Sequence, residues 1–288
     1  MQIKSYLIIF ITLTLSYISI NVVNAESLPS EWYKLSKNQK KIAYNIMSTE
    51  YMYSCCDTTI LKCIESKKDC KLITHLIRHI CILLLEGNDE SEIKRSLSKR
   101  AMTILGRDYS SKIDLKDLPV AGDRNSPVTV VIYACLRCAY CSKIIPPLYD
   151  SITNGNLKGK AKLIYKPFVI KGHLGAKQAE KSVIAANMQN RAWEYIIYAY
   201  HDFSTEYKDG MYFQYASDLK LNFNKFVNTV NDNKITNYLI KYKKEGLILN
   251  VQSTPTIFIN GKQYITSLSY DIIEDVILEE YYRKIGKM

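Results

Sequence analysis

A cysteine pair at the junction of an apolar run and a helix constrains this chain more than any other feature. Residues 128–133 read Val-Thr-Val-Val-Ile-Tyr. β-branched and aromatic residues without charge are typical of a strand buried on both faces. The residues from Cys138 onward predict a helix, with Cys141 one turn further along. Residues three apart share one helix face, so this pair can close a disulfide across the first turn.

The start of a helix also favours redox chemistry at Cys138. Its free N–H groups and partial positive charge stabilise a thiolate, and Arg137 adds a second positive charge. A cysteine so placed has a pKa of roughly 3.5–7.5 instead of about 8.5, which makes it a good nucleophile and leaving group. We predict that Cys138 is the nucleophile and Cys141 the shielded resolving thiol. The alternatives are a structural disulfide and a metal site, although a metal site usually needs a second ligand pair.

A second signal lies more than a hundred residues downstream, where residues 254–261 read Thr-Pro-Thr-Ile-Phe-Ile-Asn-Gly. Taken with the strand from Ser126, the Cys-Ala-Tyr-Cys motif and Pro146, residues 119–288 resemble the DsbA-like thiol-disulfide oxidoreductases of the thioredoxin superfamily. The resemblance implies an α/β thioredoxin fold with an inserted helical subdomain. It also implies a cis bond before Pro255, facing the disulfide, and backbone pairing between Thr254 and the substrate chain.

Two positions depart from the pattern of that family. Ala139 stands where many relatives have proline, so the dipeptide Ala139-Tyr140 leaves the redox potential open. Cys135 stands three residues before the nucleophile, where relatives often have an acidic residue.

The first 25 residues predict a secretory signal peptide. Lys4 precedes an apolar run from Tyr6 to Ile20, and residues 23–25 read Val-Asn-Ala, a small-residue cleavage pattern. An uncleaved membrane anchor is the alternative, because residues 6–23 approach the length that crosses a bilayer. We expect a periplasmic or secreted protein.

All eight cysteines lie beyond residue 25, and six of them lie outside the Cys-x-x-Cys pair. In an oxidising compartment these six are expected to form disulfides. The candidates are Cys55, Cys56, Cys63, Cys70, Cys81 and Cys135. Five precede the linker, which leaves one without a local partner, so we predict that Cys135 bonds to an N-terminal cysteine.

The N-terminal cysteines have other interpretations. Cys55-Cys56 can act as a second redox pair, or a zinc site can use His75 and His79, which share a helix face at i and i+4. The region also bears a weaker resemblance to the small helical thiol domain of CcmH-type cytochrome c maturation proteins.

The pattern of elements predicts four segments. Residues 1–25 form the signal peptide, 26–107 a cysteine-rich all-α domain, 108–127 a polar linker, and 128–288 the DsbA-like domain with a helical insertion at about 175–246. Helices are expected over residues 30–54, 175–200, 218–231, 233–244 and 269–285. Asn260-Gly261 predicts a type I′ hairpin turn between two short strands. Trp193 is expected in the core, His201 at the surface and His173 after the second strand.

The formal net charge is +11. The lysines are scattered among acids without a basic run, which is typical of a solvated surface and argues against nucleic-acid binding. Such a charge favours acidic client proteins or an anionic membrane surface.

These features favour an exported protein disulfide oxidase over a reductase or isomerase. It would exchange disulfides with thiol-containing exported clients, use no cofactor beyond the Cys138–Cys141 disulfide, and be regenerated by a membrane redox partner. The alternatives are a non-catalytic, disulfide-stapled binding or chaperone module, and a thiol reductase or isomerase, including one for apocytochrome c maturation. The oligomeric state is left open.

Overall fold

The computed structural model describes residues 28–106, 111–204 and 206–288. They separate into two compact units, the first ending at Ser98 and the second formed by Lys99–Lys287. The division falls within one helix, and the domain boundaries predicted near residues 107 and 127 stay predictions. The predicted signal peptide lies outside the described residues. No described helix combines the length and the apolarity needed to cross a bilayer.

The first unit is all-helical, as predicted. Its elements are α1 (Ser30–Lys34), α2 (Lys37–Thr49), α3 (Ile60–Glu65), α4 (Lys71–Leu85) and the first part of α5 (Glu90–Leu105). The single helix expected over residues 30–54 is wrong, because Ser36 starts a new helix. Its side chain accepts from the Gln39 backbone N–H, and the Gln39 side chain accepts from the Ser36 N–H.

Two local disulfides close the loop around α3. Cys55 bonds to Cys70 and Cys56 to Cys63. Sequence separations of 15 and 7 residues make both bridges staples within the first unit.

The predicted bond between Cys135 and an N-terminal cysteine is wrong. Cys81 and Cys135 are both free thiols. Each is fully buried in the core of its own unit, Cys81 on α4 and Cys135 after the central strand. Burial raises the pKa of Cys81 to about 12, so it is an inert apolar side chain at neutral pH.

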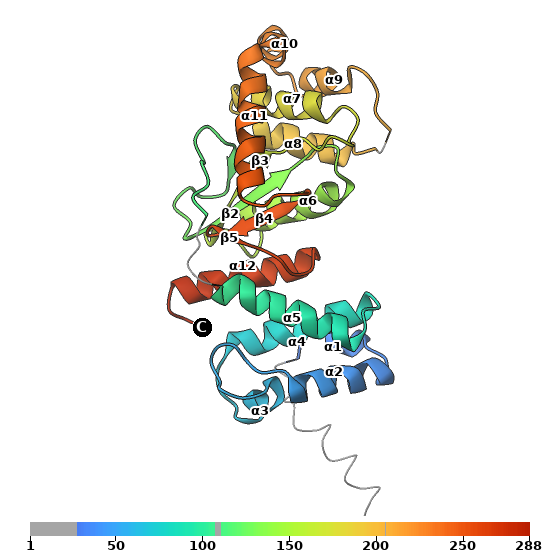
Figure 1. The fold of residues 1–288 in the computed structure, drawn as a ribbon, viewed down its shortest axis with the longest axis vertical. Coiled ribbons are helices and arrows are strands. Elements are labelled where there is room, and N and C mark those ends of the chain that lie inside the picture. The colour runs from blue at the N-terminus through green and yellow to red at the C-terminus, as the bar shows by residue number, and fades with distance from the viewer. Residues whose placement is uncertain (1–27, 107–110, 205) are drawn as a thin grey trace, which may run out of the picture. The chain divides into compact units, whose positions relative to one another are not determined.

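The second unit is built on a mixed five-stranded sheet of order β1-β3-β2-β4-β5 (Figure 1). The strands are β1 (Val120–Ala121), β2 (Val128–Ala134), β3 (Ala161–Pro167), β4 (Thr256–Ile259) and β5 (Lys262–Gln263). The central strand β2 runs parallel to β3 and antiparallel to β4. At the β4–β5 turn Asn260 and Gly261 both have positive φ, as a type I′ turn requires.

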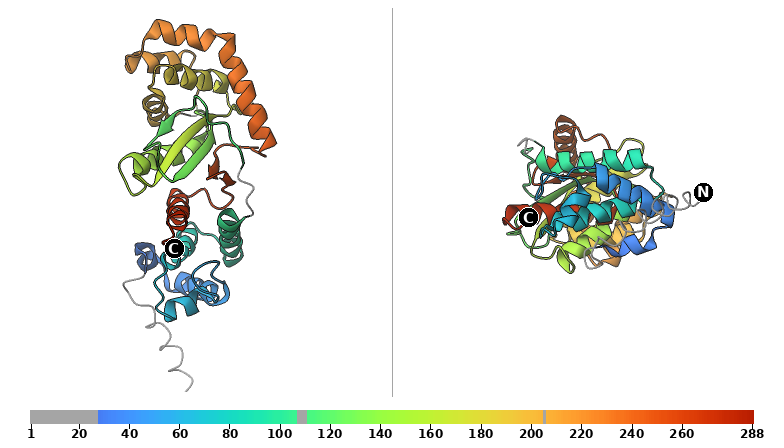
Figure 2. Two further views of the ribbon diagram at one scale, coloured as in Figure 1. Left: turned by 90° about the vertical axis from the view of Figure 1, so that its left-hand side faces the viewer. Right: turned by 90° about the horizontal axis from the view of Figure 1, so that it is seen from below.

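Helices cover both faces of this sheet. On one face α6 (Ala139–Thr153) and α12 (Tyr270–Lys284) pack against each other and against β2 and β3. On the other face lies α11 (Asn233–Ile248), so α6 and α11 flank the sheet from opposite sides (Figure 2). The core under α11 includes Tyr133, Phe168, Leu239, Tyr242 and Phe258. This α/β arrangement confirms the predicted thioredoxin fold.

In its described residues the insertion between β3 and β4 holds five helices rather than the three expected. They are α7 (Ala176–Asn187), α8 (Ala192–His201), α9 (Met211–Asp218), α10 (Phe223–Asn231) and α11. The helix expected over residues 175–200 breaks at Asn190, which has φ 60°. An asparagine tolerates this left-handed conformation. The periodicity of apolar residues along the sequence does not reveal where the helix breaks.

Two neighbouring residues of α11, the last helix of the insertion, contact the sheet. Glu245 accepts from the Tyr133 hydroxyl at 3.0 Å and pairs with the fully buried Lys166 ammonium. At Gly246 an added Cβ would lie 2.5 Å from Phe168 and 3.2 Å from Tyr133, so only glycine permits this approach. These contacts fix the insertion against the strand that leads to the cysteine pair.

A buried ion pair joins α12 to the C-terminal part of α5 inside the second unit. Arg100 donates to one Glu279 carboxylate oxygen through Nε at 3.1 Å and Nη2 at 2.9 Å. Both side chains are fully buried.

Candidate active site

Cys138 and Cys141 lie at the start of α6, at the carboxyl end of the central strand. Cys138 is the N-cap residue, with extended backbone, and its N–H donates to the Cys135 carbonyl at 3.0 Å. Cys141 follows on the first turn and has no exposed surface, while Cys138 is 3% exposed. The nucleophile is thus more enclosed than the sequence suggests.

The two thiols have opposite acidities. The pKa of Cys138 is lowered to about 5, with a hydrogen bond from the Cys141 side chain as the largest cause. Thr254 and the backbone N–H groups of Cys141 and Tyr140 also stabilise the thiolate, against the opposing effect of burial. Burial, followed by the hydrogen bond to Cys138, holds the pKa of Cys141 well above its usual value. One sulfur is therefore a thiolate at neutral pH and the other a protonated thiol.

The segment before β4 covers the Cys138 sulfur. The Thr254–Pro255 bond is cis, as the resemblance implies. In its protonated form Cys138 donates from Sγ to the Thr254 carbonyl at 3.1 Å, a contact that explains the low exposure of the cysteine. The structure thus brings together Cys138, Cys141, Thr254 and Pro255 from two segments more than a hundred residues apart.

Arg137 makes contacts other than the predicted charge interaction with Cys138. Its Nε donates to the Leu174 carbonyl at 3.1 Å and its Nη1 to the Ser204 carbonyl at 2.7 Å. Arg137 is not among the leading causes of the low pKa at Cys138. It joins the active-site loop to two places in the insertion, one before α7 and one after α8. In the dipeptide that follows, Ala139 is exposed and Tyr140 is 65% exposed.

A buried carboxyl that the sequence analysis did not single out lies behind the cysteine loop. Glu180, on α7, accepts from the Leu136 N–H at 2.8 Å and from the Tyr165 hydroxyl at 3.2 Å. Burial raises the pKa of Glu180 to about 8, against lowering contributions from Leu136, Tyr165 and Cys135. An acidic residue on the apolar, alanine-rich face of residues 176–186 is the signal that points to it.

Cys135 lies between this carboxyl and the reactive pair. Burial is the largest cause of its raised pKa, followed by the charge of Glu180. The Tyr200 hydroxyl donates to the Cys135 carbonyl at 3.2 Å. Cys135 is thus a protonated, enclosed thiol at neutral pH.

Trp193 and the histidines His79, His173 and His201 lie in different surroundings. Trp193 is buried and stacks on Tyr149, with ring centroids 5.2 Å apart. His201 is exposed, and His173 lines a pocket after β3. His79 is buried, with Nε2 2.8 Å from Ser96 Oγ. Among the described residues no cluster of three or more His, Cys, Asp or Glu side chains is suited to a metal ion.

A thioredoxin fold that carries an acidic thiol at a helix start, beside a cis-proline, defines the class of thiol-disulfide oxidoreductases. The family model described as thioredoxin matches residues 115–279. The chain belongs to the thioredoxin family, and the predicted DsbA-like resemblance is confirmed.

Solved structures of the same fold include oxidised BdbD from Bacillus subtilis, with a TM-score of 0.52, 21% identity, and coverage of 58% of this chain and 95% of that chain. Alpha-DsbA1 from Wolbachia pipientis aligns with a TM-score of 0.52 and 20% identity, over 62% of this chain and 98% of that one. At these identities the likeness shows the fold.

A curated relative is the Na(+)/H(+) antiporter NhaA 3 of Salinispora tropica, 23% identical over 192 residues. The match covers 64% of this chain and 28% of the antiporter. The chain therefore corresponds to little more than a quarter of that protein's length.

Proposed function

We propose that the chain is an exported thiol-disulfide oxidase that acts through Cys138 and Cys141. The observation that carries this proposal is the pairing of an acidic thiol, with a pKa of about 5, and a buried neighbour whose pKa is raised. A structural disulfide has no need of such an asymmetry, whereas exchange chemistry depends on it.

The reaction begins with the Cys138–Cys141 disulfide. A client thiolate attacks Cys138 Sγ, a client–Cys138 bond forms, and the Cys138–Cys141 bond breaks. Cys141 leaves as a thiolate and takes up a proton because its pKa is high. A second client thiolate then attacks the client sulfur of the mixed disulfide and releases the Cys138 thiolate. Two electrons pass from the client to the enzyme, and the client gains a disulfide.

The low pKa of Cys138 supports the oxidase direction. A thiolate stable at neutral pH is a good leaving group in the second step and stabilises the reduced enzyme. The oxidised enzyme is then a strong disulfide donor. A reductase or isomerase would use the same residues, and the reduction potential of the pair and its regenerating partner distinguish the three activities.

The Thr254–Pro255 segment is the proposed client-binding edge. The Thr254 carbonyl lies 3.1 Å from Cys138 Sγ, so a client backbone paired with Thr254 would bring its cysteine to that sulfur. Thiol-containing exported proteins are the proposed clients, and a membrane redox partner would return the Cys138–Cys141 pair to the disulfide. No cofactor beyond this disulfide is needed for the electrons to balance.

Matched serine variants test the mechanism. Cys138→Ser should lose oxidation of reduced ribonuclease and reduction of insulin alike, because no sulfur remains to form the mixed disulfide. Cys141→Ser should instead accumulate mixed disulfides, detected by mass spectrometry under non-reducing conditions. Turnover retained by the Cys138 variant would overturn the assignment, and the reduction potential of the pair then decides between oxidase and reductase.

Export has its own test. If residues 1–25 are removed as a signal peptide, exported protein should begin at Glu26 when its N-terminus is sequenced. Exported protein that still begins at Met1 would favour the membrane anchor.

A further inference from the structure

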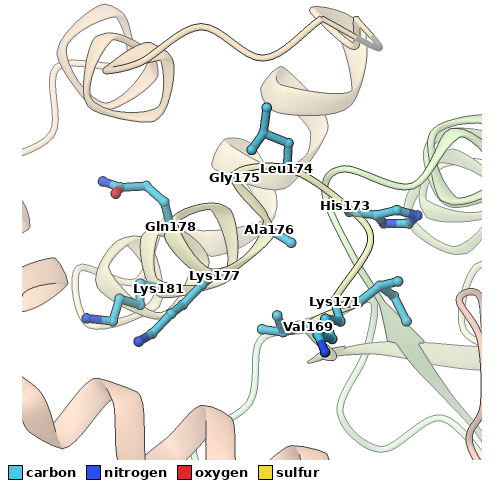
Figure 3. A pocket seen from close by; sticks show the side chains of 10 residues that line it. Val169, Lys171, His173, Leu174, Gly175, Ala176, Lys177, Gln178 and Lys181 are labelled. Carbon is cyan, nitrogen blue, oxygen red and sulfur yellow. The ribbon is translucent and has the colours of Figure 1, made fainter.

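An open pocket of about 540 Å³ lies between the segment after β3 and the N-terminal half of α7. We call it the lysine pocket. Its lining includes Val169, Lys171, His173, Leu174, Lys177 and Lys181. Figure 3 shows Lys177 and Lys181 on α7, across from Val169 and Lys171 on the segment that follows β3.

The pocket carries positive charge. Lys171 and Lys177 are exposed, and within the described part of the chain neither has an ion-pair partner. Lys181 Nζ donates to the Val230 carbonyl at 3.0 Å, which orients the ammonium but leaves its charge in place. No Asp or Glu is among the described residues that line the pocket. Three lysine side chains therefore line one opening.

The nearest acid on α7 does not offset these charges. Glu180 is fully buried and engaged with Leu136 and Tyr165 behind the cysteine loop. Lys243, on α11, adds another cation at the edge, because its Nζ donates to the Val169 carbonyl at 3.1 Å.

The pocket also presents apolar surface. Leu174 is 71% exposed, and the half-buried Val169 contributes aliphatic groups beside the lysines. A small inorganic anion would leave this surface uncovered, whereas a polypeptide with acidic and apolar side chains would cover both kinds of group.

The wall of the pocket is attached to the residue before the nucleophile. Arg137 Nε donates to the Leu174 carbonyl, and Cys138 follows Arg137 in the chain. An extended polypeptide advances roughly 3.3 Å per residue, so a client that places its cysteine at Cys138 reaches this wall within a few residues.

We propose that the lysine pocket binds an acidic, apolar-containing segment of the client polypeptide, close in sequence to the client cysteine. This inference rests on the proposed function and specifies the clients of the same site. Acidic clients dock more often because complementary charge raises the association rate.

The test measures how fast the oxidised full-length enzyme reacts with two single-cysteine peptides. One peptide carries Asp and Glu with a leucine beside its cysteine, and the other carries Asn and Gln at the same positions. Stopped-flow fluorescence gives the ratio of the two rates. We expect the acidic peptide to react about tenfold faster at low salt, with the ratio approaching one at about 0.5 M salt as the charges are screened.

The pocket variant Lys171→Gln/Lys177→Gln should bring this ratio to within about twofold of one. Lys116→Gln/Lys158→Gln is the matched control, since it removes two exposed lysines outside the pocket and the same net charge. The control should keep the ratio of the unmodified enzyme. A general effect of the basic surface would lower both variants equally and would overturn the proposal.

Two further outcomes separate this proposal from others. If neither peptide reduces the unmodified enzyme, the proposed function fails. If the neutral peptide reacts but the acidic one has no advantage, only the client preference fails.

A further experiment measures binding of the enzyme and its pocket variant to vesicles that contain anionic phospholipid. Loss of vesicle binding by the pocket variant, with an unchanged peptide ratio, would overturn the client proposal in favour of a membrane surface.

Discussion

The Leu136 backbone N–H donates to the Glu180 carboxyl over 2.8 Å, where neither residue meets solvent. A carboxyl from the insertion therefore supports the loop that ends in the reactive cysteine. Around this carboxyl lie the hydroxyl groups of Tyr165, Tyr195 and Tyr200 and the thiol of Cys135. None of them carries a positive charge, so burial determines the acidity of Glu180.

Glu180→Gln should change how stability depends on pH. The folded-state pKa of about 8 exceeds the unfolded value, so the folded protein binds more protons between pH 4.5 and 8. Its contribution is present at low pH and is lost as the pH rises through this window, by at most about 1.4 kcal/mol per pH unit. Glutamine keeps an acceptor for Leu136 but does not titrate.

Urea unfolding of the oxidised protein at pH 5 to 9 measures this effect. The oxidised form is used because the Cys138 thiolate, whose folded pKa is depressed, gives the opposite trend in the reduced form. We expect the unmodified protein to lose stability relative to Glu180→Gln as the pH rises. Parallel curves for the two proteins would contradict the prediction.

Cys141→Ala should raise the pKa of Cys138, because the hydrogen bond from Cys141 is the largest cause of its acidity. Cys141→Ser keeps a donor of similar position and should preserve more of the shift. Thiolate absorbance at 240 nm, recorded against pH, gives both values. Equal pKa values in the two variants would show that the helix start and Thr254 dominate instead.

Glu279→Gln should destabilise the second unit by about 3–5 kcal/mol, because it removes the buried carboxylate that pairs with the Arg100 guanidinium. Glu194→Gln is the matched control, since it breaks an exposed pair with Arg191 and should cost less than about 1 kcal/mol. Chemical denaturation followed by circular dichroism compares them. Similar midpoints for the two variants would count against the importance of the buried pair.

Cys55→Ser/Cys70→Ser should destabilise the first unit by about 3 kcal/mol, and removal of the shorter Cys56–Cys63 loop by about 2 kcal/mol. Hydrogen exchange of the full chain, followed by mass spectrometry, should show faster exchange in α4. Peptides from α6 serve as the internal control. Unchanged exchange in α4 would mean that packing, not the bridges, limits its opening.

Local sequence signals predicted much of the second unit. The charge-free run at residues 128–133 became the central strand, and Asn260-Gly261 became a turn with two positive φ values. Each signal involves neighbours in the chain, so periodicity and turn chemistry suffice to read it.

The sequence did not reveal features that depend on distant partners. The importance of Glu180 arises from contacts with Leu136, 44 residues earlier, and with Tyr165 on another strand. Arg137 was expected to act on its neighbour Cys138, yet carbonyl groups 37 and 67 residues away engage it. The pairing of Cys55, Cys56, Cys63 and Cys70 was likewise open, because spacing alone does not choose between connectivities.

Gly246 limits how this chain can diverge. A methyl group there would overlap the Phe168 ring. The side chains at positions 246, 168 and 133 therefore compete for the same limited space. A lineage that acquires alanine at position 246 must accept a smaller side chain at position 168 or 133, or let α11 move away from the sheet. The second course would weaken the Glu245 contacts with Lys166 and Tyr133. Substitutions at these three positions should therefore occur together across descendants of this chain, although the positions are separated by up to 113 residues.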